Sequence, residues 1–102
     1  MIKYIISLGL NDKDTKTQLI DTITAYKKAN EIVLKYVDGA TVYETQGIFK
    51  HNDGVITIEK SLQIEIWDAS KKAIENITNE LKTAFNQEAV NVQIQEVTSY
   101  MV

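Results

Sequence analysis

Two short polar segments hold the side chains that are best suited to bind or act on a ligand. Glu59 and Ser61 fall on the polar side of an alternating stretch, and Gln87 and Glu88 follow a helix-like stretch. A carboxyl group that is buried in a cavity can have a raised pKa, so Glu59 is the acid/base candidate. The competing interpretation is structural, with backbone capping at the turn and cross-strand contacts in the sheet. The four side chains form one site if the fold joins the two segments.

Composition excludes several other kinds of site. The chain has no Cys, Pro or Arg and a single His, His51, which falls in a turn-like segment and is expected to be solvated there. Thiol catalysis and disulfides are therefore excluded. Asp12 and Asp14 do not match a calcium loop, and we expect them at the entry of a helix. Without clustered His, Cys or carboxylates, no metal, cofactor or catalytic residue is predicted.

Charge and hydropathy limit the classes of partner that we expect the protein to bind. The formal net charge is −3, and every basic residue is Lys, so the bidentate phosphate contacts of Arg are missing. This argues against nucleic acid as a partner. With 44% hydrophobic and 25% charged residues, the composition is that of a globular protein. No apolar run is long enough to span a membrane, and no export signal begins the chain. We therefore expect a cytoplasmic protein that does not bind a membrane.

Hydrophobic periodicity predicts six elements in the order strand, helix, strand, strand, helix, strand. Thr15 and Gln18 have the spacing of a capping box, which predicts a first helix from there to Asp38, with Asn30 as a possible break. The apolar stripe of that helix is expected to contain Leu19, Ile20, Ile23, Tyr26, Val33, Leu34 and Val37. The strands are expected at 2–8, 40–50, 56–66 and 90–95, and the second helix from Asp68 and Ser70 to Phe85.

This order predicts an α+β, ferredoxin-like βαββαβ fold: a four-stranded antiparallel sheet with two helices on one face. The 102 residues fit one domain, 1–102. The first strand is expected inside the sheet, and the segment from His51 to Gly54 is expected to turn a hairpin. Lys60 falls on the apolar side. Three explanations are open: its side chain reaches solvent at an edge, it marks a bulge, or it pairs with a carboxylate. The last strand is expected to end or bulge near Glu96.

Four short motifs resemble a known family. The segments Gly39-Ala40-Thr41-Val42, Gly47-Ile48-Phe49, Glu59-Lys60-Ser61 and Phe85-Asn86-Gln87-Glu88-Ala89-Val90 are similar, in order and spacing, to the G-x-T-V, G-x-W, E-x-S and F-x-Q-E-x-V signatures of a small bacterial family of unknown function. The resemblance runs from about Tyr4 to the C-terminus. It implies a ferredoxin-like domain and no established activity. Phe49 departs from the family's usual Trp.

Two classes of function remain. The first is a non-enzymatic protein-binding or self-associating module, most simply a homodimer, that uses the open sheet face or an edge strand. Tyr43, Phe49 and Trp67 are its candidate interface anchors. The second is a small-molecule-binding protein or minor enzyme with a pocket between the sheets of a dimer, with Glu59 as its acid or base. A structural accessory of a larger assembly, without a ligand, is a third possibility.

Overall fold

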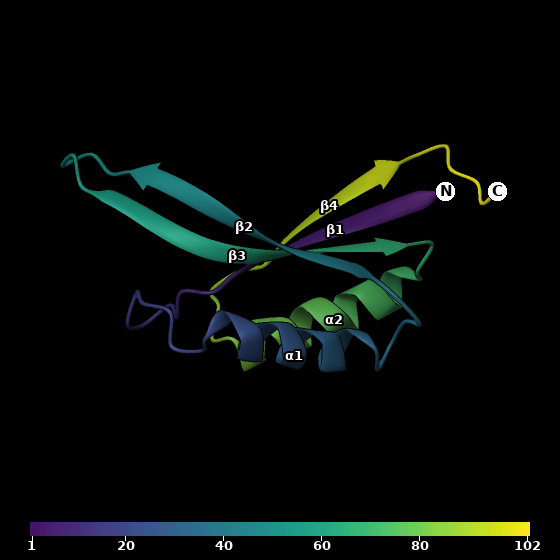
Figure 1. Cartoon of the computed structure of the whole chain (residues 1–102), viewed down its shortest axis with the longest axis horizontal. Coiled ribbons are helices and arrows are strands. Elements are labelled where there is room, and N and C mark those ends of the chain that lie inside the picture. Colours follow the sequence, from purple (N-terminus) through teal and green to yellow (C-terminus); the bar gives the residue numbers. More distant parts are fainter.

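The computed structural model describes all 102 residues and has the predicted order of elements. These are β1 (Ile2–Gly9), α1 (Thr22–Val33), β2 (Thr41–Lys50), β3 (Ile56–Trp67), α2 (Lys71–Ala84) and β4 (Asn91–Glu96). The strands form one antiparallel sheet in the order β2-β3-β1-β4, and both helices cover the same face (Figure 1). The ferredoxin-like prediction is confirmed, and β1 lies inside the sheet as expected.

The core lies between the sheet and the helices. Alternation puts Tyr4, Ile6 and Leu8 of β1 on the same side as Leu62, Ile64 and Ile66 of β3, because these residues are direct partners in the register. The helices cover this layer with Ala25, Ala29, Ile32, Val33, Ile74, Ile77, Leu81 and Phe85. All 15 buried residues are apolar. The energy that holds the two layers together is therefore mainly hydrophobic burial.

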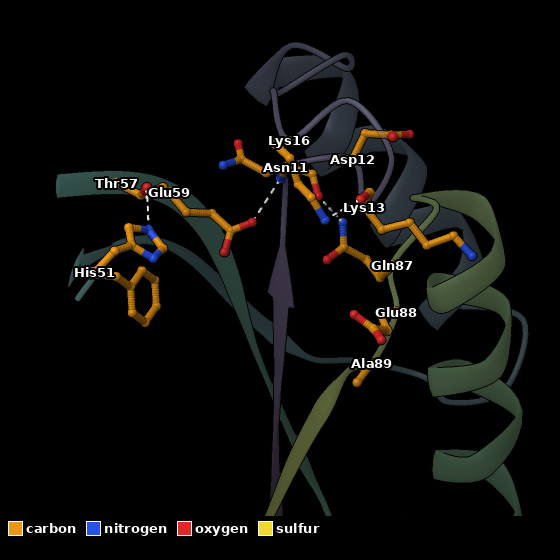
Figure 2. Close-up of a pocket in the computed structure, with 11 residues that line it drawn as sticks. Asn11, Asp12, Lys13, Lys16, His51, Thr57, Glu59, Gln87, Glu88 and Ala89 are labelled. Carbon is orange, nitrogen blue, oxygen red and sulfur yellow. Dashed lines mark hydrogen bonds between the residues drawn. The ribbon is translucent and has the colours of Figure 1, made fainter. Parts of the chain in front are cut away.

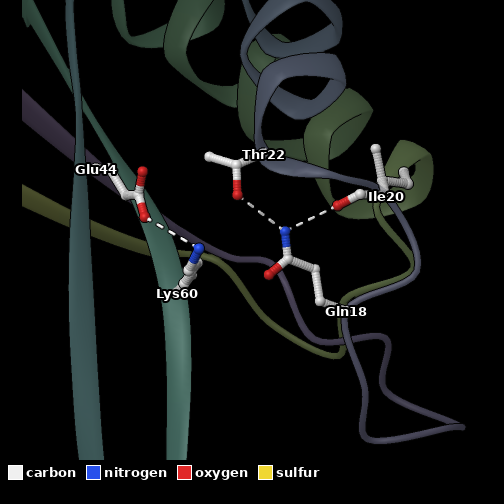
Figure 3. Close-up of polar contacts among 5 residues, drawn as sticks. All are labelled: Gln18, Ile20, Thr22, Glu44 and Lys60. Atoms are coloured by element: carbon white, nitrogen blue, oxygen red, sulfur yellow. Dashed lines mark hydrogen bonds and ion pairs between the residues drawn. The ribbon is translucent and has the colours of Figure 1, made fainter.

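The predicted start of the first helix is wrong. Thr15 and Gln18 form no capping box, because α1 begins at Thr22 with Asp21 as the N-cap, whose side chain accepts from the Thr24 N–H at 2.9 Å. Gln18 instead donates from Nε2 to the Ile20 carbonyl at 2.9 Å and to Thr22 Oγ1 at 3.1 Å (Figure 3). Capping boxes share their residue types with ordinary polar turns, so spacing alone did not separate the two.

The buried stripe of α1 also differs from the prediction. Leu19, Ile23 and Leu34 are each more than half exposed. The later start makes Ala25 and Ala29 the residues that face the sheet, and these small side chains let the helix approach it closely. The helix passes through Asn30 without a break and ends at Val33, and a turn carries the chain on to Val37.

The second half of the chain follows the prediction closely. Ser70 caps α2 by accepting from the Ala73 N–H at 3.1 Å, and β4 ends at Glu96 where the alternation changes phase. Lys28 of α1 donates to the Ala84 carbonyl at the end of α2, and its ammonium lies 5.5 Å from the Phe85 ring centroid. This cross-helix contact satisfies a carbonyl that has no partner within α2.

The β2–β3 hairpin extends beyond the rest of the sheet (Figure 1). β1 pairs with β3 only from Ser61 to Trp67, so residues 47–50 and 56–59 form a two-stranded segment, the distal ribbon. Ile48, Ile56 and Ile58 lie on its helix-side face, yet each is more than half exposed because no helix reaches them. Both chain termini lie at the opposite end of the sheet (Figure 1).

Lys60 marks the boundary between the distal ribbon and the packed part of β3. Its ammonium lies 3.7 Å from the Glu44 carboxylate across the hairpin (Figure 3). Of the three explanations for a Lys at this apolar position, the structure shows the pairing with a carboxylate. Because both side chains are about half exposed, the pair contributes little to stability.

Candidate functional site

Glu59 and Gln87 meet where β1 ends, and the backbone of Asn11 holds both. The Asn11 N–H donates to Glu59 Oε2 at 3.0 Å, and Gln87 Nε2 donates to the Asn11 carbonyl at 2.7 Å (Figure 2). Gln87 Nε2 also donates to the Phe85 carbonyl at 3.2 Å. Both side chains are half-buried. These bonds leave the second carboxylate oxygen of Glu59 and the amide oxygen of Gln87 free of protein partners.

The absence of a side chain at Gly9 makes this meeting possible. A Cβ built there would lie 2.9 Å from Glu59 Oε2 and 3.1 Å from Gln87 Oε1. Both distances are below ordinary van der Waals contact, so the two polar groups occupy the space that any other residue would fill. Gly9, the last residue of β1, therefore gives both side chains the space that they occupy.

A pocket of about 460 Å³ opens beside the two side chains. Three segments build its walls: the loop after β1, the distal ribbon, and the turn after α2. Its lining consists of Asn11, Asp12, Lys13, Lys16, Phe49, His51, Thr57, Glu59, Gln87, Glu88 and Ala89 (Figure 2). A second hollow of about 490 Å³ adjoins it on the open sheet face and shares Phe49, Glu59, Gln87 and Ala89 with it.

The structure thus unites four of the predicted site residues: Glu59, Gln87, Glu88 and Phe49. Gln87 also satisfies backbone groups, as the structural interpretation predicted, and its capping bonds are what orient it toward Glu59. Phe49 lies over Gly47, where an added Cβ would be 3.2 Å from its ring, and the residue is 54% exposed beside the pocket. His51, which is exposed as expected, also lines the pocket, and its Nε2 lies 2.8 Å from Thr57 Oγ1.

Ser61 takes part in a different network. Its hydroxyl lies 2.6 Å from Thr45 Oγ1, and Gln63 joins this pair to Ser7 by accepting from Ser7 Oγ at 2.6 Å and donating to Thr45 Oγ1 at 3.0 Å. This polar ladder crosses β1, β3 and β2 on the face without helices. Ser61 lines the adjoining hollow but is bonded within the sheet, as the structural interpretation predicted.

Tyr43 and Trp67 lie away from the pocket, toward the other end of the open face. The Tyr43 hydroxyl donates to Glu65 Oε2 at 2.8 Å, and the Lys3 ammonium lies 3.3 Å from Glu65 Oε1 and 5.1 Å from the Trp67 ring centroid. The hydrogen bond from Tyr43, and next the Lys3 ammonium, lower the pKa of Glu65, while the same bond raises the pKa of Tyr43. These two aromatic residues and Phe49 therefore do not form one surface.

The loop after β1 is the part of the site that sequence analysis missed. Asn86 Nδ2 donates to Asp12 Oδ2 at 2.8 Å and to Asp14 Oδ2 at 2.9 Å, which fastens the loop to the end of α2. Asp12 and Asp14 thus do not lie at the entry of α1. The bond from Asn86 is the main reason why the pKa of Asp12 is lowered. Asn86 within the F-x-Q-E segment was the only signal for this contact.

The structure contains no group of three or more His, Asp or Glu side chains placed to hold a metal ion. No helix is long and apolar enough to cross a membrane.

Comparison with known proteins places the chain in a family. Residues 3–100 match the model of a family described as "Protein of unknown function (DUF3574)". The chain belongs to this family. The DUF3574 match confirms the resemblance to a family of unknown function that the four motifs indicated. No curated protein sequence matches the chain.

Solved structures that resemble the chain include two of a phage SAM lyase. A phage SAM lyase in complex with S-methyl-5′-thioadenosine is 28% identical to this DUF3574 chain, with a TM-score of 0.66, over 93% of this chain and 80% of that chain. The same kind of enzyme in its apo state gives 27% identity and a TM-score of 0.65, over 92% and 78%. The divalent cation tolerance protein CutA from Archaeoglobus fulgidus, 11% identical with a TM-score of 0.54 over 99% and 88%, shares the fold alone.

Proposed function

We propose that this DUF3574 protein binds S-adenosylmethionine in the pocket beside Gly9 and cleaves it as a lyase. The observation that carries the proposal is the meeting of Glu59 and Gln87 on Asn11, which leaves a carboxylate oxygen and an amide oxygen free beside the pocket. The 28% identity to a phage SAM lyase supports the choice of ligand. This conclusion favours the small-molecule alternative over a module without activity.

The chemistry of the lining suits such a ligand. S-adenosylmethionine carries a sulfonium and an ammonium group, and Glu59 and Glu88 offer carboxylates to these cations. Phe49 offers an aromatic face, on which an adenine ring can stack or a cation can rest. A pocket of about 460 Å³ lies within the range for ligands of this size.

The lyase step needs no group that the pocket lacks. The carboxylate oxygen of S-adenosylmethionine forms a bond to its own Cγ, the Cγ–S bond breaks, and its electron pair stays on sulfur. The products are S-methyl-5′-thioadenosine and homoserine lactone, so atoms and charge balance without water, a proton acceptor or a cofactor. The protein contributes by holding the carboxylate and the sulfonium in line. Glu59 and Gln87 then act by binding and orienting the ligand.

The test is direct. Purified protein is incubated with S-adenosylmethionine, and S-methyl-5′-thioadenosine is quantified by mass spectrometry. We expect product from the wild type, a loss of about a hundredfold in rate for Glu59→Gln, and no change for Glu96→Gln at the end of β4. Absence of both product and S-methyl-5′-thioadenosine binding in the wild type would refute the proposal.

A second proposal concerns self-association, which the distal ribbon favours. A two-stranded ribbon without a covering layer is marginally stable in water, and this one exposes Ile48, Ile56 and Ile58 on a single face. We propose that a second copy of the chain covers this face, because its own distal ribbon exposes the same apolar residues. The expected contact was the open face, where the polar ladder lies, or an edge strand; the proposed contact is the helix-side face of the ribbon, which includes the edge strand β2. The two proposals are compatible because the pocket uses the opposite face.

A further inference from the structure

Two lysines line the pocket, but only one of them turns into it. Lys13 and Lys16 both belong to the loop after β1. Figure 2 shows Lys13 extending away from Glu59, whereas the Lys16 side chain descends from the loop toward Gln87. The Lys16 ammonium donates to the Lys13 carbonyl at 2.6 Å, which holds it at the wall of the pocket. Lys16 therefore places a positive charge at the wall of the pocket, on the side of Gln87.

The backbone keeps Lys16 in this position. Its φ is 61°, a left-handed conformation that residues other than Gly and Asn rarely adopt. Such a conformation persists only where the surrounding contacts impose it. Here the Lys16 N–H donates to the Asp12 carbonyl at 2.9 Å, the Asp12 N–H donates to the Thr17 carbonyl at 2.8 Å, and Asn86 fixes the Asp12 side chain. The backbone of Lys16 is thus held in place before any ligand binds, and the bond to the Lys13 carbonyl holds its ammonium.

The charges around Lys16 define the anion that it can accept. Asp12, Glu59 and Glu88 line the same pocket. Three carboxylates would therefore repel a phosphate, whereas only one inward-pointing lysine would attract it. A single carboxylate on a ligand that also carries cations fits this arrangement better. The amino-acid end of S-adenosylmethionine has this pattern: an ammonium and a carboxylate on one carbon, with a sulfonium further along the chain.

We infer that Lys16 binds the α-carboxylate of the S-adenosyl ligand and thereby selects substrates that retain the amino-acid end. This inference rests on the proposed function, because it assigns one end of the same ligand. It also distinguishes substrate from product. In the lactone the carboxylate has become an uncharged ester, and S-methyl-5′-thioadenosine has no carboxylate at all. The contact with Lys16 therefore exists in the bound substrate and is lost as the products form.

The test uses two ligands that differ only by the carboxylate. S-adenosylhomocysteine and its decarboxylated form both lack the sulfonium, so the proposed lyase step does not consume them during a titration. Calorimetry with the wild type is expected to show about tenfold tighter binding of the form with the carboxylate, the size expected for a charged hydrogen bond. Lys16→Gln is expected to abolish this preference, and Lys16→Arg to keep most of it. Lys72→Gln, on the exposed side of α2, is the matched control.

The possible outcomes are distinct. Equal binding of both ligands by wild type and Lys16→Gln would overturn the role of Lys16 and leave the proposed function intact. Failure of the wild type to bind either ligand or S-methyl-5′-thioadenosine would overturn both. Affinity for S-methyl-5′-thioadenosine is expected to be the same in wild type and Lys16→Gln, and this result would show that the variant has an intact pocket.

Discussion

The Glu59 carboxylate and the Gln87 amide bind the two ends of one backbone residue, Asn11, at 3.0 Å and 2.7 Å. Residues that lie 28 positions apart in the sequence thus share a single anchor, and neither can shift without changing the loop that the other holds. The site is therefore a unit built from β3, the turn after α2 and the loop after β1.

Replacing Gly9 by Ala is expected to damage the site more than the fold. The new Cβ would displace the ends of the Glu59 and Gln87 side chains, which lie 2.9 Å and 3.1 Å from it. Because these are flexible ends at a half-buried position, we expect a change in unfolding free energy below about 1 kcal/mol. Affinity for S-methyl-5′-thioadenosine, measured by calorimetry, should fall about tenfold. Gly39→Ala, where nothing lies within 4 Å, is the control and should bind normally.

The two Phe residues of the chain should give opposite results. Phe85 is 5% exposed in the core, so Phe85→Ala is expected to lower the unfolding free energy by about 3–5 kcal/mol. Phe49 is 54% exposed, so Phe49→Ala should change it by less than about 1 kcal/mol while weakening nucleoside binding about tenfold. Urea unfolding and calorimetry measure the two effects. A large loss of stability in Phe49→Ala would show that its role is structural.

Acid should remove the stabilisation that Glu65 provides. Its pKa in the folded protein is lowered by the Tyr43 hydroxyl and the Lys3 ammonium, so the folded state favours the carboxylate. This contribution is fully present above the unfolded pKa of about 4.3 and is lost as the pH falls through the lower folded value. The melting temperatures of wild type and Glu65→Gln should therefore differ most near neutral pH and converge in acid. Tyr43→Phe should reduce this difference; if it does not, the hydroxyl is not the cause.

The distal ribbon should control self-association. Ile58→Ser and Ile48→Ser are expected to weaken a homodimer at least about tenfold, because each removes a large apolar side chain from the proposed contact. Sedimentation velocity over a range of concentrations measures this. Leu34→Ser, at a comparably exposed position after α1, should leave the oligomeric state unchanged. A wild type that stays monomeric at every concentration would contradict the self-association proposal.

The fold could be predicted because apolar and polar residues alternate regularly along its strands. In β3, Leu62, Ile64 and Ile66 alternate with polar residues, and this pattern correctly identified the face that packs on the helices. The same pattern continues through Ile56 and Ile58, which are exposed. Periodicity shows which face of a strand is apolar but does not show how far the opposing layer extends. The exposed Ile23 was assigned to the buried stripe of α1 for a different reason, because the face of that helix that packs on the sheet is the one with Ala25 and Ala29.

The site was only partly predictable. Short motifs identified Glu59 and Gln87, but their meeting depends on the main chain of Asn11, and backbone groups carry no sequence signal. The left-handed backbone of Lys16 likewise depends on its bond to Asp12, which Asn86 fixes from the end of α2. Sequence patterns report local preference, whereas these contacts join segments that are distant along the chain.

The placement of both termini at the end of the sheet opposite the distal ribbon has a practical consequence (Figure 1). All three segments that form the pocket lie at or beyond the Gly9 end of β1, whereas Met1 and Val102 lie near its first residues. A purification tag, a fluorescent fusion or a surface tether attached at either terminus would therefore point away from the ligand opening. Immobilised protein should keep its pocket accessible for screening.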